Sequence, residues 1–257
     1  MLKLNKINKY YNEGTVNEIC LFKDFNLTVE EGQFVSVVGS NGSGKTSMLN
    51  IICGTVPADS GTIYIGKENI THMPEFKRQR HMGRVYQNPA MGTCPHMTIL
   101  ENMALADNKG KRFNLRPGTD KNRRDNYREQ LKTLGLGLED KLHVKAGLLS
   151  GGQRQAMALL MAAMTPIRFL ILDEHTAALD PKTAQTVMEL TDKIVKEKKL
   201  TAVMVTHNLR YALEYGDRLL MMHQGTSVMD LSGPKKAAVQ IQDLLEKFNA
   251  ISIECGN

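Results

Sequence analysis

The chain has 257 residues, of which 42% are hydrophobic and 5% aromatic, and it carries a formal net charge of +6 at pH 7. This length and composition suit one large α/β domain or two modest ones with a buried core. No run approaches the roughly 18 apolar residues that span a bilayer, and the charged start MLKLNKINKYYNEG does not resemble a signal peptide. A secreted or membrane-spanning chain is therefore not expected.

The basic charge and the cysteines point to no special chemistry. An excess of positive charge suits a nucleic-acid binder or a protein near an anionic membrane, but a solvated basic surface explains it as well. Four cysteines, at positions 20, 53, 94 and 255, show no metal-ligand spacing. We expect reduced thiols, no zinc site and no nucleic-acid partner.

The first third of the chain predicts strands and one helix. Residues 2–7 and 20–29 predict a small antiparallel sheet, and residues 33–39, QFVSVVG, predict a buried strand that follows a turn. Residues 48–54, MLNIICG, have helical spacing and end in a glycine, as a helix does at its C-terminus. Residues 61–70 predict a further pair of strands.

The middle of the chain is helical and polar, and the last third returns to α/β order. Helices are expected in 98–106 and 122–135, around a basic loop. The apolar runs RFLILD (168–173) and LTAVMVTH (200–207) are typical of buried parallel strands, with a helix over about 181–198 between them. The run DRLLMMHQG (217–225) and an amphipathic helix around 237–248 complete the chain.

Residues 39–46, GSNGSGKT, match the phosphate-binding pattern G-x-x-x-x-G-K-[ST] between a strand and a helix. The glycines let successive backbone N–H groups face the phosphates, and Lys45 offers a charge to the β- and γ-phosphates. The Thr46 hydroxyl is a ligand for Mg²⁺. The expected cradle consists of Gly39, Ser40, Asn41, Gly42, Ser43, Gly44, Lys45, Thr46 and Ser47.

Two carboxylates follow the apolar strand in FLILDE. Acidic residues often end strands for structural reasons, but beside a phosphate-binding loop the pair favours nucleotide hydrolysis. Asp173 would hold Mg²⁺ through water, and Glu174 would polarise the attacking water.

A second glycine turn, LSGGQ at 149–153, precedes a helix and has no lysine of its own. Three further motifs accompany it: Gln87 in GRVYQNP, the triplet Ala178-Leu179-Asp180, and His207 in VMVTHN. In this order and at this spacing, the chain resembles the ATP-binding cassette (ABC) ATPases over nearly its whole length. The resemblance implies an α/β P-loop NTPase fold: a RecA-like core, an antiparallel β subdomain and an inserted helical subdomain.

The resemblance also implies how the two turns cooperate. In these ATPases two cassettes pack head to tail, and the signature of one covers the ATP held by the P-loop of the other. Ser150, Gly151, Gly152 and Gln153, with Asp180, would contact the partner's nucleotide. Gln87 would reach Mg²⁺ and the attacking water, and His207 the γ-phosphate. Tyr11 is expected to stack on adenine, with Tyr10 as the alternative.

The resemblance further suggests a single ABC ATPase domain over 1–257, with 1–88 and 154–257 as core and 89–153 as the helical and signature subdomain. His175 departs from the family pattern, in which proline is common at this position. We expect it to be a turn residue with a side-chain hydrogen bond rather than a catalytic group. The stretch DEHTAALDPKTA is similar to a subgroup of bacterial ATPases for uptake of amino acids such as tryptophan and tyrosine.

The expected function is therefore an ATP-hydrolysing subunit of a membrane transporter, an importer of amino acids or another small solute. It would lie peripherally at the cytoplasmic face of the membrane as a homodimer. Its partners would be separate permease subunits and an extracytoplasmic substrate-binding protein, and its cofactors ATP and Mg²⁺. The alternative is a soluble ABC ATPase that drives cytosolic assembly, as in iron–sulfur-cluster formation.

A basic segment lies between Asp107 and Arg128, with eight Lys or Arg residues and three Asp. A solvated loop explains such a run, but attraction to anionic lipid is the second possibility. In that second case, neutralising Lys111, Arg112, Arg123 and Arg124 should weaken association with liposomes or with the transporter complex.

Overall fold

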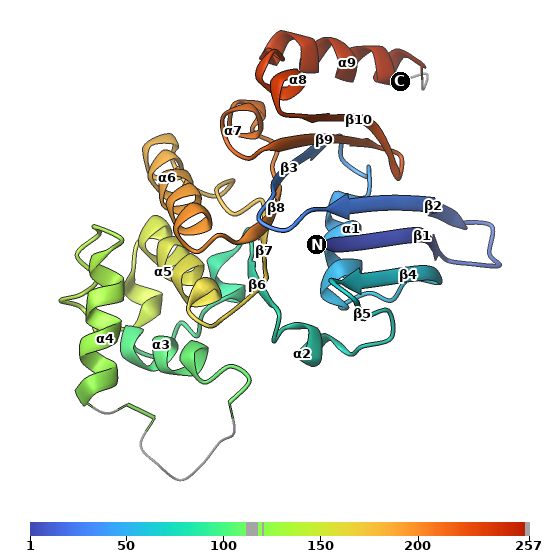
Figure 1. The fold of residues 1–257 in the computed structure, drawn as a ribbon. Helices are drawn as coiled ribbons and strands as arrows, with labels where there is room; N and C mark the ends of the chain where they lie inside the picture. The colour runs from blue at the N-terminus through green and yellow to red at the C-terminus, as the bar shows by residue number, and fades with distance from the viewer. Residues whose placement is uncertain (112–117, 120, 255–257) are drawn as a thin grey trace. The chain divides into compact units, whose positions relative to one another are not determined.

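The computed structural model describes residues 1–111, 118–119 and 121–254 (Figure 1). Their contacts form two compact units, which we call unit 1 (Met1–Gln79 with Lys199–Asn257) and unit 2 (Arg80–Lys198). The finer division expected from the sequence, with a helical part at 89–153, stays a prediction.

Unit 1 contains the expected antiparallel sheet. Its strands are β1 (Leu2–Tyr11), β2 (Ile19–Val29), β4 (Ser60–Ile65) and β5 (Glu68–Asn69), in the order β2-β1-β4-β5. β1 pairs antiparallel with both β2 and β4, side by side in Figure 1. Leu2 and Leu4 of β1 are buried on one face, because successive side chains of a strand point to opposite faces. Ile7 is buried as well, after a register shift between Leu4 and Ile7.

Unit 1 also contains four strands in the order β10-β9-β3-β8. They are β3 (Phe34–Gly39), β8 (Thr201–Val205), β9 (Arg218–His223) and β10 (Thr226–Ser232). β3 runs parallel to β8 and β9, while β10 is antiparallel to β9. Every residue of β3 is buried. This central position confirms the predicted buried strand and fixes where the phosphate-binding loop begins.

The helices of unit 1 are α1 (Lys45–Cys53), α2 (Glu75–Arg78), α7 (Leu209–Glu214), α8 (Pro234–Ala237) and α9 (Ile241–Glu254). α1 ends at Gly54, whose φ of 85° places it in the left-handed region that favours glycine. The expected helix over 237–248 is wrong at its start: Ala237 ends α8, and α9 begins at Ile241. Leu244 of α9 is buried against Leu219 and Met221 of β9, so α9 covers this sheet.

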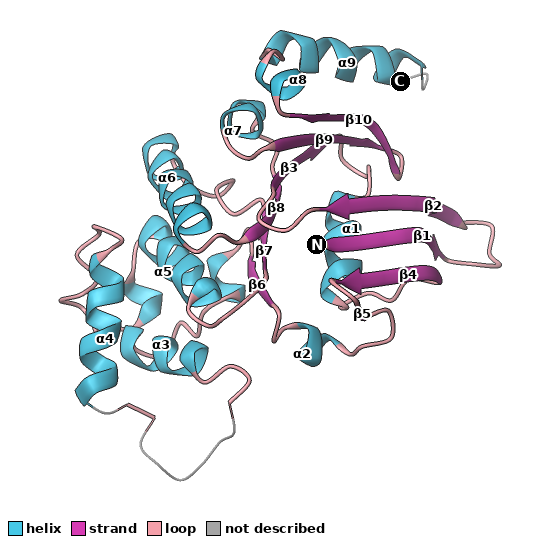
Figure 2. Ribbon diagram, viewed as in Figure 1, coloured by secondary structure: helices cyan, strands magenta, loops and turns pink. Residues whose placement is uncertain are grey.

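Unit 2 combines two strands with helices (Figure 2). β6 (Met82–Val85) and β7 (Phe169–Asp173) are parallel. The helices are α3 (Ile99–Asp107), α4 (Lys121–Lys132), α5 (Gly151–Ala163) and α6 (Pro181–Glu197), with 3₁₀ turns at Pro89–Met91 and Ala146–Leu148. α5 packs against β6, α3, α4 and α6. Met157, Leu159 and Leu160 of α5 are buried, so this helix contributes to the core of unit 2.

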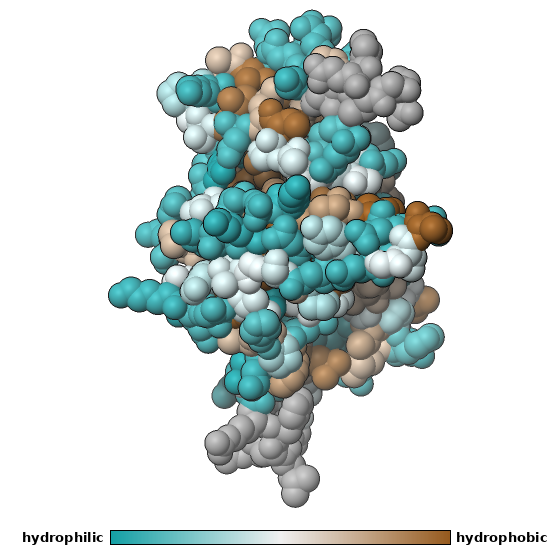
Figure 3. Space-filling model, turned by 90° about the vertical axis from the view of Figure 1, so that its right-hand side faces the viewer, coloured by the Kyte–Doolittle hydropathy of each residue, from teal (hydrophilic) through white to brown (hydrophobic). Residues whose placement is uncertain are grey.

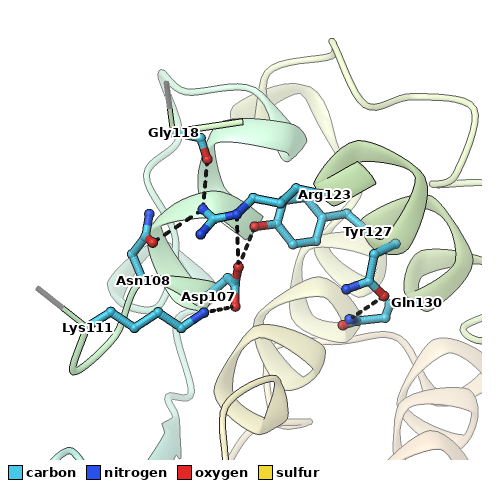
Figure 4. Close-up of polar contacts among 8 residues, drawn as sticks. Asp107, Asn108, Lys111, Gly118, Arg123, Tyr127 and Gln130 are labelled. Atoms are coloured by element: carbon cyan, nitrogen blue, oxygen red, sulfur yellow. Dashed lines mark hydrogen bonds and ion pairs between the residues drawn. The ribbon is translucent and has the colours of Figure 1, made fainter. Parts of the chain in front are cut away.

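The described part of the basic segment is held by Asp107 (Figure 4). Its carboxylate accepts hydrogen bonds from Lys111 Nζ at 2.6 Å and from the Tyr127 hydroxyl at 2.9 Å, and Arg123 Nε lies 3.9 Å away. Burial opposes ionisation of Asp107, but the hydrogen bonds from Lys111 and Tyr127 prevail and lower its pKa. Burial first, then the bond to Asp107, raises the pKa of Tyr127. Lys111 and Arg123 therefore both contact Asp107 of the same chain. Arg112 lies outside the described residues.

Among the described residues, no helix is long and apolar enough to cross a bilayer. Figure 3 shows one face of the molecule, on which hydrophilic residues predominate and hydrophobic ones are scattered. The apolar residues of α9 are covered only in part, because Leu244 is buried while Ile241 and Leu245 are each 42% exposed.

Candidate nucleotide-binding site

The phosphate-binding loop connects β3 to α1. Gly42 and Gly44 have φ values of 78° and 98°, which L side chains rarely adopt. Lys45 is only 5% exposed, and its Nζ donates to the carbonyl oxygens of Gly39 and Ser40 at 2.9 and 2.8 Å. These bonds satisfy a buried ammonium group and place it inside the turn of the loop.

The end of β9 supports this loop from the side. A Cβ at Gly39 would lie 2.3 Å from the Met222 carbonyl oxygen, so only glycine allows this approach. Ser40 Oγ lies 3.3 Å from His223 Nδ1, and the Gly225 amide donates to the Ser43 carbonyl oxygen at 3.1 Å. Sequence reasoning missed His223 and Gly225, because their role arises from the pairing of β9 with β3, which the sequence does not give.

Tyr11 ends β1 and lies near the first turn of α1. Its hydroxyl is 3.4 Å from Ser47 Oγ, and Lys9 Nζ lies 5.4 Å from its ring centroid. The Tyr10 side chain bonds instead to Cys20, and this hydrogen bond raises the pKa of Tyr10. The contact with Ser47 favours Tyr11 over Tyr10 as the aromatic residue of the nucleotide site.

His207 lies at the same sheet edge as the phosphate-binding loop. Val37 of β3 is level with Val205 of the parallel β8, so Gly39 and His207 follow their strands at the same end. His207 is exposed, and the neighbouring Asn208 caps α7 by accepting from the Tyr211 amide. Unit 1 therefore brings together the loop, Tyr11 and His207.

Gln87, Asp173 and Glu174 lie at one sheet edge in unit 2. β6 and β7 are parallel, with Val85 level with Leu172, so Gln87 and Asp173 both lie beyond that level at the carboxyl ends. Asp173 is 9% exposed, and its Oδ2 is 2.7 Å from a terminal nitrogen of Arg84. Glu174 has a φ of 48°, a strained value for a side chain of its size. Sequence reasoning missed Arg84.

The glycine turn at 149–153 forms the N-terminus of α5. Ser150 is the N-cap: its Oγ accepts from the Gln153 amide at 3.2 Å, and the Gln153 side chain accepts from the Ser150 amide at 3.3 Å. This reciprocal pair is a capping box. A Cβ at Gly152 would lie 2.0 Å from Thr183 Cγ2, so glycine here permits close packing against α6.

Asp180 caps the neighbouring helix. Its side chain accepts from the Thr183 amide at 3.1 Å, and hydrogen bonding to Thr183 lowers the pKa of Asp180. Because Thr183 also adjoins Gly152, the two predicted contact motifs of unit 2 lie side by side.

His175 makes the hydrogen bond expected of it. Its Nε2 lies 3.1 Å from Thr191 Oγ1, and the Thr191 hydroxyl donates to the Val187 carbonyl oxygen at 2.7 Å. Since that hydroxyl proton is used, Nε2 carries the imidazole proton and donates it to Thr191. The side chain is 2% exposed, and burial lowers the pKa of His175 to about 4.

Comparisons with known proteins agree with these motifs. The family model described as ABC transporter matches residues 22–177. The chain is 44% identical to a tyrosine transport ATP-binding protein of Clostridioides difficile (strain R20291), over 96% of this chain and 98% of that one.

Two solved structures of one bacterial ABC transporter cassette share the fold. One is dimeric, and the other is a dimeric post-hydrolysis state bound to ADP and phosphate. Each is 32% identical to this chain, has a TM-score of 0.77, and is matched over 90% of this chain and 98% of its own length.

The chain thus belongs to the ABC transporter family. It is an ABC-type ATPase, with the mixed α/β P-loop fold, antiparallel sheet and helical part that the sequence predicts. These relatives give no support to the alternative of an ATPase for iron–sulfur-cluster assembly.

Proposed function

We propose that this chain is the ATP-binding subunit of a bacterial importer for tyrosine or a chemically similar amino acid. The observation that carries this proposal is the 44% identity to a tyrosine transport ATP-binding protein over almost the full length of both chains. The subunit would bind at the cytoplasmic face of the membrane to separate permease subunits, and an extracytoplasmic binding protein would deliver the amino acid.

The P-loop residues would hold the phosphates of ATP. The backbone N–H groups of the loop would face the nucleotide, and Lys45 would exchange its bonds to the loop carbonyls for bonds to phosphate oxygens. Tyr11 would stack on adenine, and His207 would contact the γ-phosphate from the neighbouring strand end.

The chemistry of the residues proposed for Mg²⁺ suits this ion. Thr46 would offer a hydroxyl, Gln87 an amide oxygen and Asp173 a carboxylate, and oxygen ligands are those that Mg²⁺ prefers. A bound Mg²⁺ would neutralise charge on the phosphates. Glu174 would then polarise the attacking water as general base.

The signature would act on a second copy of the chain. The N-terminus of α5 carries partial positive charge and presents Ser150, Gly151 and Gly152 next to Asp180, which suits contact with a phosphate. Two copies packed head to tail would each complete the other's site. ATP binding would close this dimer and hydrolysis would open it. The dimer would thus alternate between two conformations that drive transport.

The test is purification of the tagged, full-length chain from detergent-solubilised membranes of its host, followed by identification of the proteins that accompany it. A multispanning protein in stoichiometric amount is the expected result. Tyrosine, added with an accompanying binding protein to the reconstituted complex, should stimulate ATP hydrolysis. Recovery of soluble assembly proteins alone would overturn the transport assignment.

A further inference from the structure

An ion pair in unit 2 involves the carboxylate proposed for Mg²⁺. Arg84 lies on β6 and is level with Ile171 of β7, two residues before Asp173, so both side chains lie on one face of the strand pair. The Arg84 and Asp173 side chains are 7% and 13% exposed, and 2.7 Å separates the guanidinium nitrogen from Asp173 Oδ2. This is a buried, charge-assisted contact.

The guanidinium has a second partner that holds it in place. Arg84 Cζ lies 4.7 Å from the ring centroid of Tyr86, within the range of a cation–π contact. The ring and the carboxylate therefore both favour a position of the guanidinium at Asp173.

This position opposes a divalent cation. The guanidinium occupies one oxygen of Asp173 and neutralises the charge that would attract Mg²⁺. A metal ion near the same carboxylate would also be repelled by Arg84, and burial of both side chains limits the screening of that repulsion by solvent.

We propose that Arg84 is the resident counter-ion of Asp173, and that Asp173 must leave Arg84 in order to hold Mg²⁺ beside a nucleotide. Arg84 therefore weakens the dependence of nucleotide binding on Mg²⁺. After hydrolysis, recapture of Asp173 by Arg84 favours release of Mg²⁺ and ADP. This inference rests on the magnesium role proposed above for Asp173.

The test compares three full-length variants: Arg84→Met and Arg84→Gln, which remove the charge, and Arg84→Lys, which keeps it. The probe is ADP with a fluorescent N-methylanthraniloyl group, since ADP is not hydrolysed. Its dissociation constant is measured in excess EDTA and again in saturating Mg²⁺. The ratio of the two constants, EDTA over Mg²⁺, reports how strongly Mg²⁺ supports nucleotide binding.

The neutral variants should raise this ratio by at least about threefold, because removing the charge removes the repulsion. Arg84→Lys should keep a ratio close to that of the wild type. If the ratio is unchanged or smaller in Arg84→Met and Arg84→Gln, the inference is overturned.

Two controls separate the causes of failure. Arg218→Met makes the same chemical change at an ion pair with Asp230, which has no proposed metal role, and should leave the ratio unchanged. Asp173→Asn should bring the ratio close to one. A ratio in Asp173→Asn equal to the wild-type value would show that the magnesium role of Asp173, and with it this inference, is wrong. If Arg84→Met does not fold, Arg84→Gln still offers Asp173 a donor and supplies the test.

Discussion

Lys45 has two sets of partners at different stages of the proposed cycle. In the structure its Nζ donates to the carbonyls of Gly39 and Ser40, which satisfies the buried ammonium. A phosphate group offers stronger, charge-assisted bonds. We therefore expect Lys45 to bond the loop carbonyls in one stage of the cycle and phosphate oxygens in the other.

Replacement of Lys45 by Met should weaken ATP binding roughly 10- to 100-fold, the usual effect of losing hydrogen bonds to a charged group. The measurement is titration with a fluorescent ATP analogue. Lys236→Met is the matched control, because Lys236 Nζ donates to the carbonyls of Tyr215 and Gly216 at 2.8 and 2.6 Å and has no proposed phosphate role. Equal loss of binding in both variants would refute the role of Lys45.

His175 should make stability depend on pH. Its folded pKa of about 4 lies below the unfolded value of 6.5, so the unfolded chain binds the proton more readily. The contribution of His175 to the free energy of unfolding should therefore be fully present above about pH 6.5 and should be lost as the pH falls toward 4. Between pH 7 and pH 5, protonation of this single group should lower the free energy of unfolding by about 2 kcal/mol.

Urea unfolding at pH 7 and pH 5 checks this expectation. His175→Gln keeps a donor for Thr191 but cannot titrate, so the variant should lose about 2 kcal/mol less than the wild type over the same range. An identical pH dependence in the two proteins would show that His175 does not titrate as described.

At the scale of elements, α5 begins with a capping box that also contains the signature serine. Ser150→Ala should lower the free energy of unfolding by about 1 kcal/mol, as loss of an N-cap does. Thr98→Ala is the matched control, because Thr98 and Glu101 form the same capping box at α3. Both variants should lose similar stability, but ATP-dependent self-association, followed by light scattering, should weaken in Ser150→Ala alone.

Helix α9 provides a test of packing. Leu244 is fully buried against β9, so Leu244→Ala should lower the free energy of unfolding by about 2–4 kcal/mol. The adjacent Leu245 is 42% exposed, and Leu245→Ala should change it by less than about 1 kcal/mol. Urea denaturation compares the two, and equal effects would contradict the assigned face of α9.

The elements that sequence predicted well have strong local signals. The P-loop follows a wholly buried strand, and Gly54 ends α1 because the left-handed C-cap favours glycine. The break before Ile241 was missed, since Pro234 starts a separate short helix that ends at Ala237. Arg84 and His223 were missed for another reason: their contacts depend on the register between strands, and no local pattern encodes which residues a strand will face.

At the scale of the whole molecule, each unit holds a different set of the predicted site residues. Unit 1 has the phosphate-binding loop, Tyr11 and His207, and unit 2 has Gln87, the signature, Asp173, Glu174 and Asp180. The signature has no lysine of its own. A second copy of the chain, which supplies the P-loop, explains this arrangement in the proposed function.

The most direct test of the proposed ATP-closed, head-to-tail dimer is the molar mass of Glu174→Gln, measured by light scattering with Mg²⁺ and ATP. Loss of the proposed general base should stop turnover and preserve the closed state, so the mass should rise from 28.7 kDa to twice that value. The same sample without nucleotide, and the double variant with Ser150→Ala, should stay predominantly monomeric. A Glu174→Gln protein that remains a monomer at saturating ATP would contradict the proposed dimer. Hydrolysis of ATP at the parental rate would contradict the role of Glu174 as general base.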